Sequence, residues 1–347
     1  MSKGKFSLAI LSMLLIISAC SNKEDQRSTS KEEANQQEEE IVAVEVDGKI
    51  VFPLTGLAVQ EGELDQRPVA VMINNHPNAR PQSGLHKADV VYEALAEGNI
   101  TRFLAIFQSE IPDVIGPVRS AREYYVDLSK GFNALYINHG WSPSAKEKLE
   151  AGEAEYLNGL FYDGTLFWRA DHRKAPHNSY ISNENIAKGA EFNHFEMTAK
   201  VEPYEFLTEE EVVNLKGEQA NKFVIKYDNS QTWHAAYEYN QTKHSYRRYS
   251  GNEQTVDLES EEPITLSNIL VVEMDHNLID DYGRRGIDLT SGGKAILLQN
   301  GLKQDVEWEN IDGRILPVNN GEIVKFVPGR TWINIVPNIE DTFSIQS

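Results

Sequence analysis

The sequence contains a single cysteine, Cys20, so no disulfide can form within the chain and a hydrophobic core must stabilise the fold. It also lacks an apolar run long enough to cross a bilayer, because the run 6–19 is shorter than the roughly 20 residues that a membrane-spanning helix needs. Positive charge is scarce: 33 Lys and Arg face 53 Asp and Glu, for a net charge of −20. Nucleic acid is therefore an improbable partner, because phosphate backbones are bound by basic surfaces.

Sequence motifs of several enzyme classes are missing as well. The chain has no P-loop, no G-x-G-x-x-G, no G-x-S-x-G nucleophile elbow and no H-E-x-x-H zinc motif. We therefore predict no cofactor, no metal site and no catalytic residue of a known motif.

The N-terminus carries the pattern of an export signal. Lysines precede the apolar run 6–19, and small residues follow it, which predicts a signal peptide over 1–19. Residues 17–20 resemble the lipobox of bacterial lipoproteins, whose cysteine receives a lipid anchor. The polar residues after it cannot bury enough surface to fold. We expect a lipidated Cys20 and a disordered acidic tether over 20–40, which would hold the protein at the extracytoplasmic face of the cell membrane.

The rest of the chain shows two kinds of pattern. Up to residue 205, short buried runs typical of strands alternate with helix signals, at 68–74, 102–108 and 134–138 for strands and at 120–131, 142–152 and 182–192 for helices. From residue 206, strand-sized runs alternate with Asn, Gly and Asp turns. We predict an α/β layered domain over 41–205 and a β-rich, mostly antiparallel domain over 206–347, an α/β or α+β fold.

Four segments resemble the YerB-like lipoprotein family of bacteria. They begin with "RPVAVMINN", "GPVRSAREYYVDL", "HRKAPHN" and "NGEIVKFVPGRTW", at 67–107, 116–128, 172–178 and 320–337. The resemblance covers roughly residues 45 to 345. It implies a two-domain protein and brings no reaction, substrate or catalytic residue with it.

Polar residues follow each predicted strand of the α/β part. If these strands are parallel, the polar loops meet at one edge of the sheet, where open α/β sheets bind their ligands. The residues in these loops are Asn75, His76, Arg119, Ser120, His139 and Ser142.

The loop at Arg119 is the sharpest candidate for a binding site. A helix that begins at Ser120 would present free N–H groups and the positive end of its dipole, and Arg119 and Arg122 would flank this anion pocket. Alternatively, Ser120 only caps the helix. Arg119 would then pair with a nearby acid, Asp127 or Asp89.

Arg102 lies inside an apolar strand and has two possible roles. It could contact a ligand, or it could form a buried ion pair with Glu93 that holds two elements together. The ion pair is the simpler account.

The segment 169–178 gathers His172, Arg173, His177 and further cations in this acidic chain. As a loop over the same edge as Arg119, it would complete a cationic cleft for an anionic group. Alternatively, it is a structural loop whose cations offset nearby acids. A metal is not expected, because the histidine spacing is not that of a zinc site and the neighbouring cations would repel an ion.

Three functions stay open. The first is a binding or accessory lipoprotein that recognises an anionic small molecule, a cell-wall component or a protein partner through the cleft. The second is an envelope-acting hydrolase or transferase, with Arg119 and Arg122 holding the substrate and His139, His172 or His177 as acid or base. The third is a purely structural interaction module. We expect the first.

Overall fold

The computed structural model describes residues 43–59 and 64–346 of the chain. The predicted signal peptide, the lipidated Cys20 and the tether lie outside the described residues and stay predictions. Below, the N-terminal half means the residues up to 205 and the C-terminal half those from 206 onward.

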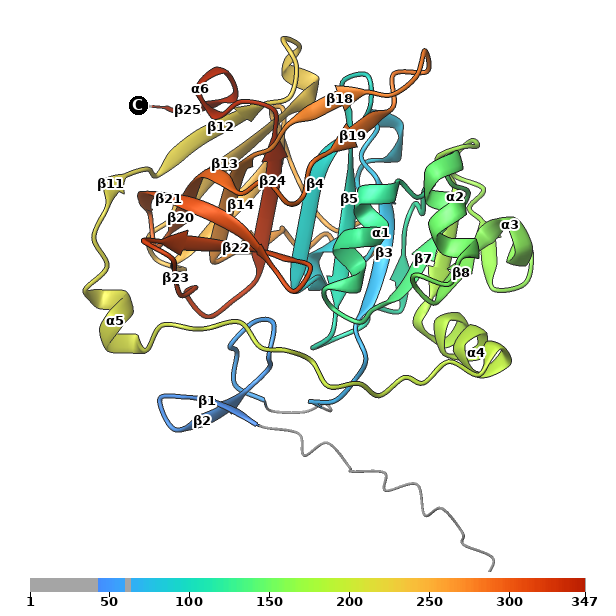
Figure 1. Ribbon diagram of the computed structural model, residues 1–347, viewed down its shortest axis with the longest axis horizontal. Helices are drawn as coiled ribbons and strands as arrows, with labels where there is room; N and C mark the ends of the chain where they lie inside the picture. Colours follow the sequence, from blue (N-terminus) through green and yellow to red (C-terminus); the bar gives the residue numbers. More distant parts are fainter. Residues whose placement is uncertain (1–42, 60–63, 347) are drawn as a thin grey trace, which may run out of the picture. The chain divides into compact units, whose positions relative to one another are not determined.

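The largest sheet draws strands from both halves of the chain (Figure 1). The N-terminal half contributes β3 (Val69–Asn74), β4 (Val90–Glu97), β5 (Ile100–Phe107), β7 (Leu135–Asn138) and β8 (Tyr156–Asn158). The C-terminal half contributes β11 (Glu218–Gln219), β17 (Asn268–Glu273), β20 (Gly293–Gln299), β21 (Leu302–Ile311), β22 (Arg314–Asn319), β23 (Glu322–Ile323) and β24 (Thr331–Val336). β24 lies between β17 and β4 and runs parallel to both, so the two halves share one continuous sheet.

Both faces of this sheet are covered, which explains why its central strands are apolar without alternation. Along β3 every residue is buried. Val71 and Ile73 point into one hydrophobic core, whereas Ala70 and Met72 point into a second core on the opposite face. Strands buried on both sides are expected to read as continuous apolar runs.

A second, antiparallel sheet from the C-terminal half packs into the first core. It consists of β12 (Lys222–Lys226), β13 (His234–Asn240), β14 (Ser245–Ser250), β15 (Glu253–Gln254), β16 (Thr265–Leu266) and β25 (Phe343–Ile345). Phe223 and Tyr237 of this sheet belong to the same core as Val71. The C-terminal half is thus rich in β-structure, as its turn-separated runs predicted.

The helices of the described residues are α1 (Glu123–Lys130), α2 (Pro143–Glu150), α3 (Gly159–Tyr162), α4 (Asn183–Asn193), α5 (Glu209–Val213) and α6 (Ile339–Thr342). Helices α1 and α2 bury side chains in the second core, and α4 and α6 bury side chains in the first. Ser142 accepts a hydrogen bond from the Ala145 N–H at 3.2 Å and so caps α2, which confirms the predicted start of that helix. Among the described residues, no helix is both long and apolar enough to span a bilayer.

The fold is mostly β, and the N-terminal half is not the layered α/β sheet that we expected. β5 runs antiparallel to both β3 and β4, and the parallel pairings between strands of this half are β3 with β7 and β7 with β8. The reason is the connection between β4 and β5, which is only the two residues 98–99, and such a short link can join only antiparallel strands. The assumed parallel direction of the strand at 102–108 is therefore wrong.

Candidate functional site

The polar loops meet at the ends of β3 and β7 although β5 is antiparallel. After β5 the chain turns back through β6 (Val114–Ile115) and runs beside β3, where the Arg119 N–H donates to the Met72 carbonyl at 2.9 Å. The His139 N–H, at the end of β7, donates to the Arg119 carbonyl at 2.9 Å. Backbone hydrogen bonds thus place Arg119 beside His139.

Two imidazole rings stack at this edge. The ring centroids of His76 and His177 are 4.5 Å apart and their planes differ by 23°. Asn74 accepts the His76 N–H with Oδ1 at 3.0 Å, so its Nδ2 donates to the Nδ1 of His177 at 2.8 Å. The Nδ1 of His76 accepts from the Asn78 N–H at 3.1 Å. This network assigns the proton of both neutral rings to Nε2, which leaves two N–H donors.

Arg119 lies close enough to these rings for its charge to act on both of them. Its Nε is buried and has no hydrogen-bond partner among the residues that the structure describes. Burial, and then the charge of Arg102, lower the pKa of Arg119 to about 10, so the guanidinium stays charged at neutral pH. Its charge in turn contributes to lowering the pKa of His76, His139 and His177.

The acids that we considered as partners for Arg119 are engaged elsewhere. Asp127 accepts from the Lys148 ammonium at 2.9 Å. Asp89 is buried and accepts the N–H groups of Gln108 and Ser109 at 2.6 and 2.8 Å. The structure therefore does not contain either predicted ion pair.

His139 is fixed on both sides of its ring. Its Nε2 lies 2.8 Å from Nη2 of Arg169, and since a guanidinium can only donate, this nitrogen is the acceptor. Its Nδ1–H then donates to Ser179 Oγ at 2.8 Å. Arg169 also pairs with Asp163 at 2.9 Å. Ser179 is buried, so the Ser179–His139 pair has the chemistry of a structural contact rather than of an exposed nucleophile.

Arg102 and Arg122 lie beneath the site and share one carboxylate. Arg102 contacts both oxygens of Glu97 at 2.8 Å through Nη2, and Arg122 contacts the same carboxylate. The predicted pairing of Arg102 with Glu93 is therefore wrong. The partner is Glu97, which lies four residues further along β4, nearer the turn into β5. Both guanidiniums are buried.

Ser120 does not begin a helix, contrary to our prediction. α1 begins at Glu123, and Arg122 occupies its N-cap position without a capping side-chain bond. Ser120 instead donates its hydroxyl hydrogen bond to the His139 carbonyl at 3.1 Å. The helix dipole therefore does not point at Arg119 as the sequence had suggested.

Three predicted residues remain, Arg173, His172 and Asn75, and two of them bond to other parts of the protein. Arg173 donates to the carbonyls of Asn78 and Pro81 and so fastens its loop to the loop that follows β3. His172 is exposed on the same loop. Asn75 is buried, and its amide donates to Thr101 at 2.7 Å.

Sequence reasoning missed Trp233 of this site, and it did not predict that Asn74, at the end of the first buried strand, bonds to His177. Trp233 ends the 3₁₀ helix Gln231–Trp233 of the C-terminal half, and its ring centroid lies 6.1 Å from that of His76. Arg80 donates to the Thr232 carbonyl at 3.1 Å and its guanidinium lies 6.0 Å from the Trp233 ring. The sequence feature that could have pointed to Trp233 is that a large aromatic residue stands in a polar turn.

The chemistry of this cluster is that of hydrogen-bond donation to an anion. Arg119 supplies a positive charge, and His76 and His177 supply Nε2–H donors, whose Nδ1 lone pairs are already used. Within 43–59 and 64–346, no group of three or more His, Cys, Asp or Glu side chains is placed to hold a metal ion.

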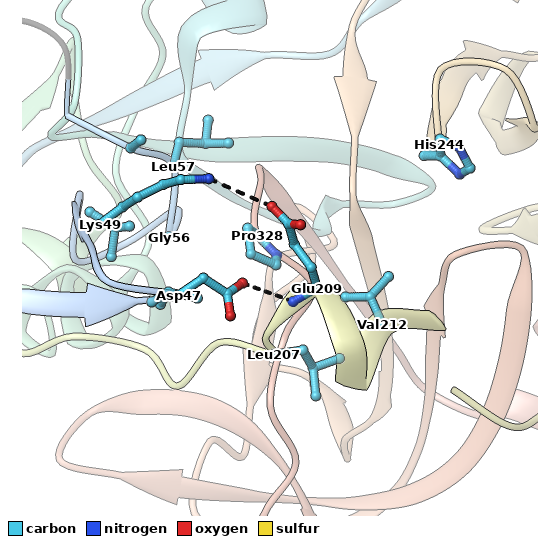
Figure 2. A pocket seen from close by; sticks show the side chains of 12 residues that line it. Asp47, Lys49, Gly56, Leu57, Leu207, Glu209, Val212, His244 and Pro328 are labelled. Atoms are coloured by element: carbon cyan, nitrogen blue, oxygen red, sulfur yellow. Dashed lines mark hydrogen bonds and ion pairs between the residues drawn. The ribbon is translucent and has the colours of Figure 1, made fainter. Parts of the chain in front are cut away.

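A separate cavity of about 590 Å³ lies between α5 and the hairpin of β1 (Val44–Val46) and β2 (Lys49–Val51). Figure 2 shows that its charged groups bond to one another: Lys49 pairs with Glu209 at 3.6 Å, and Asp47 accepts the Glu209 N–H at 2.9 Å. Its remaining walls are mostly apolar. We therefore place the candidate site at Arg119 and not here.

Comparison with known proteins agrees with this architecture. Residues 54–196 match the N-terminal domain of a protein family of unknown function, DUF3048, and residues 223–333 match its C-terminal domain. The chain therefore belongs to the DUF3048 family, and the family resemblance found in the sequence is confirmed.

One relative has both a curated sequence and a solved structure. The chain is 50% identical over 292 residues to the protein named "Putative lipoprotein YerB" of Bacillus subtilis (strain 168), covering 84% of this chain and 88% of that one. The crystal structure of the YerB protein from Bacillus subtilis matches with a TM-score of 0.81 at 48% identity, covering 86% of this chain and all of that chain.

Proposed function

We propose that this protein is a membrane-anchored lipoprotein of the bacterial envelope that binds an anionic ligand through Arg119, His76 and His177. The observation that carries the proposal is Arg119, a partly exposed charged side chain that has no carboxylate partner and no side-chain hydrogen bond among the described residues. A charge that is partly removed from water and has no counter-charge costs free energy. A bound carboxylate or phosphate would remove that cost with charge-assisted hydrogen bonds.

The charge around the site supports an anion rather than a cation. The buried guanidiniums of Arg102 and Arg122 both contact the carboxylate of Glu97, and the charge of Arg102 acts on Arg119. The whole chain has a net charge of −20, which repels anions elsewhere. A local positive site in an acidic protein focuses anions onto one place.

The anchor is proposed from the N-terminal sequence and from the name of the relative. Residues 17–20 resemble a lipobox, and lipidation of Cys20 would place the two domains outside the cytoplasm. The anionic ligand would be a small molecule, a cell-wall component or a group on a protein partner.

The hydrolase or transferase has less support from the geometry. The serine nearest a histidine of the site, Ser179, is buried behind His139. The Nδ1 atoms of His76 and His177 both accept hydrogen bonds, so these rings are donors and not bases in their neutral form. The cluster is better suited to holding an anion than to activating a nucleophile.

Calorimetric titration with phosphate and sulfate tests the anion site, on the chain with Cys20→Ala so that it stays unlipidated. We expect binding by the parent protein, and at 100 times Kd a stabilisation of about 2.7 kcal/mol. Arg119→Met should abolish it, whereas Arg247→Met, on β14 away from the site, should not. Unchanged affinity in Arg119→Met, or no anion binding by the parent protein, would overturn the proposal.

A further inference from the structure

Trp233 adds an aromatic wall to the anion site, and it comes from the other half of the chain. Its ring stands at 65° to the ring of His76, with 6.1 Å between centroids. The bond from Arg80 to the Thr232 carbonyl at 3.1 Å fixes the turn that carries it. The side chain is partly exposed, so part of its ring faces solvent. The site therefore has an anion-binding part from the N-terminal half and an aromatic part from the C-terminal half, with the Arg80 guanidinium 6.0 Å from the Trp233 ring centroid.

The segments around this wall carry polar side chains. Gln231 and Thr232, next to Trp233, are exposed, and the Gln231 amide donates to Asn252 Oδ1 at 2.7 Å. These side chains both donate and accept hydrogen bonds. A ligand that lay against Trp233 would meet an apolar ring surrounded by polar groups.

We infer, building on the proposed function, that the ligand is a sugar that carries an anionic group. The anion would bind Arg119 and the Nε2–H donors of His76 and His177, and the sugar ring would lie against Trp233. A pyranose ring has an apolar C–H face that packs on an aromatic ring, and hydroxyl groups that need polar partners.

The test compares three probes by calorimetry at pH 7.5: inorganic phosphate, glucose 6-phosphate and glucose. We expect glucose 6-phosphate to bind about fivefold more tightly than phosphate, the gain typical of one good contact with an aromatic ring. Trp233→Ala should remove that difference and leave phosphate affinity unchanged. Trp233→Phe should keep part of the difference between the two affinities. This variant still tests the inference if Trp233→Ala does not fold.

Trp141→Ala is the matched control. This tryptophan is also partly exposed, but its ring packs on Tyr156 and Phe161 at 5.9 and 5.6 Å rather than on His76. Its loss should leave the ratio of the two affinities unchanged. Equal binding of phosphate and glucose 6-phosphate by the parent protein, or an unchanged ratio in both Trp233 variants, would overturn the inference while the anion site stands. Failure of every anion to bind would instead remove the proposed function itself.

Discussion

Arg248 on β14 donates a hydrogen bond to the carboxylate of Glu93 on β4 at 2.8 Å, and each side chain is only 1% exposed. The indole N–H of Trp332 on β24 donates to the same carboxylate oxygen at 3.0 Å. The guanidinium also lies 4.6 Å from the ring centroid of Trp332 and 5.1 Å from that of Phe103. A buried ion pair and two cation–π contacts thus join the second sheet to the largest one.

This pair predicts a large loss of stability when one partner is removed. Arg248→Met leaves the Glu93 carboxylate buried without its counter-charge, which typically costs about 3–5 kcal/mol. Urea denaturation measures the loss. The exposed pair Lys222–Glu238, 3.0 Å apart, is the control, and Lys222→Met should cost less than about 1 kcal/mol. Equal losses in the two variants would contradict the role given to Arg248.

Asp257 predicts a stability difference that depends on pH. It accepts the Gly84 N–H at 2.6 Å and the Ser260 N–H at 2.9 Å, and it lies 3.0 Å from Nδ1 of His86. Burial alone would raise the pKa of Asp257, but the close imidazole of His86 and the backbone hydrogen bonds from Ser260 and Gly84 hold it well below its usual range. Because the folded pKa lies below the unfolded value of about 3.9, the stabilisation is complete above that pH and is lost as the pH falls towards the folded pKa.

Asp257→Asn should therefore cost about 1–3 kcal/mol at pH 7. The difference from the parent protein should be the same at pH 5 and should narrow below pH 4. Urea denaturation at pH 7, 5 and 3 gives the comparison. A difference that stayed constant down to pH 3 would show that the ionised carboxylate is not what stabilises this contact.

The two histidines of the anion site predict that the affinity for an anion rises only when the pH falls below 7. Burial, and then the charges of Arg80 and Arg119, lower the pKa of His76, and burial, then His76 and Arg119, lower that of His177. Both rings are thus neutral at pH 7, and a bound anion favours their protonation. Sulfate, which does not titrate here, should bind equally at pH 8 and 7 and several times more tightly at pH 5. The double variant His76→Gln/His177→Gln should not show this increase, and a parent protein with constant affinity down to pH 5 would refute the linkage.

The sequence located three strands of the N-terminal half, β3, β5 and β7, but not their directions. β4 reads "VVYEALAE", and its Glu, Ala and Leu favour a helix, so no strand was predicted there. Burial against β5 and β24 overrides that preference. Without β4, the hairpin that makes β5 antiparallel could not be recognised.

Only part of the candidate site could be predicted from the sequence. His76, Arg119 and His139 were identified because polar residues that follow buried strands gather at the end of a sheet, and His177 because the segment 169–178 gathers cations and histidines in an acidic chain. Trp233 was not, because only the packing of the second sheet on the first brings it to His76. The partner of Arg102 was also missed, since β4, which carries both Glu93 and Glu97, was not recognised as a strand.

Gly159 predicts how the position of His139 affects the anion site. A Cβ atom at residue 159 would lie 2.1 Å from Nδ1 of His139, so in Gly159→Ala the imidazole must move and lose its bond to Ser179. Since the His139 backbone also holds Arg119, sulfate affinity should fall severalfold. Gly152→Ala is the control: its φ of +77° makes alanine unfavourable by about 1 kcal/mol, yet nothing lies within 4 Å of the added atom. Both variants should melt at lower temperature, but only Gly159→Ala should bind sulfate more weakly, because only there does the added atom reach the site. Parent-like affinity in Gly159→Ala would mean that Arg119 keeps its place without His139.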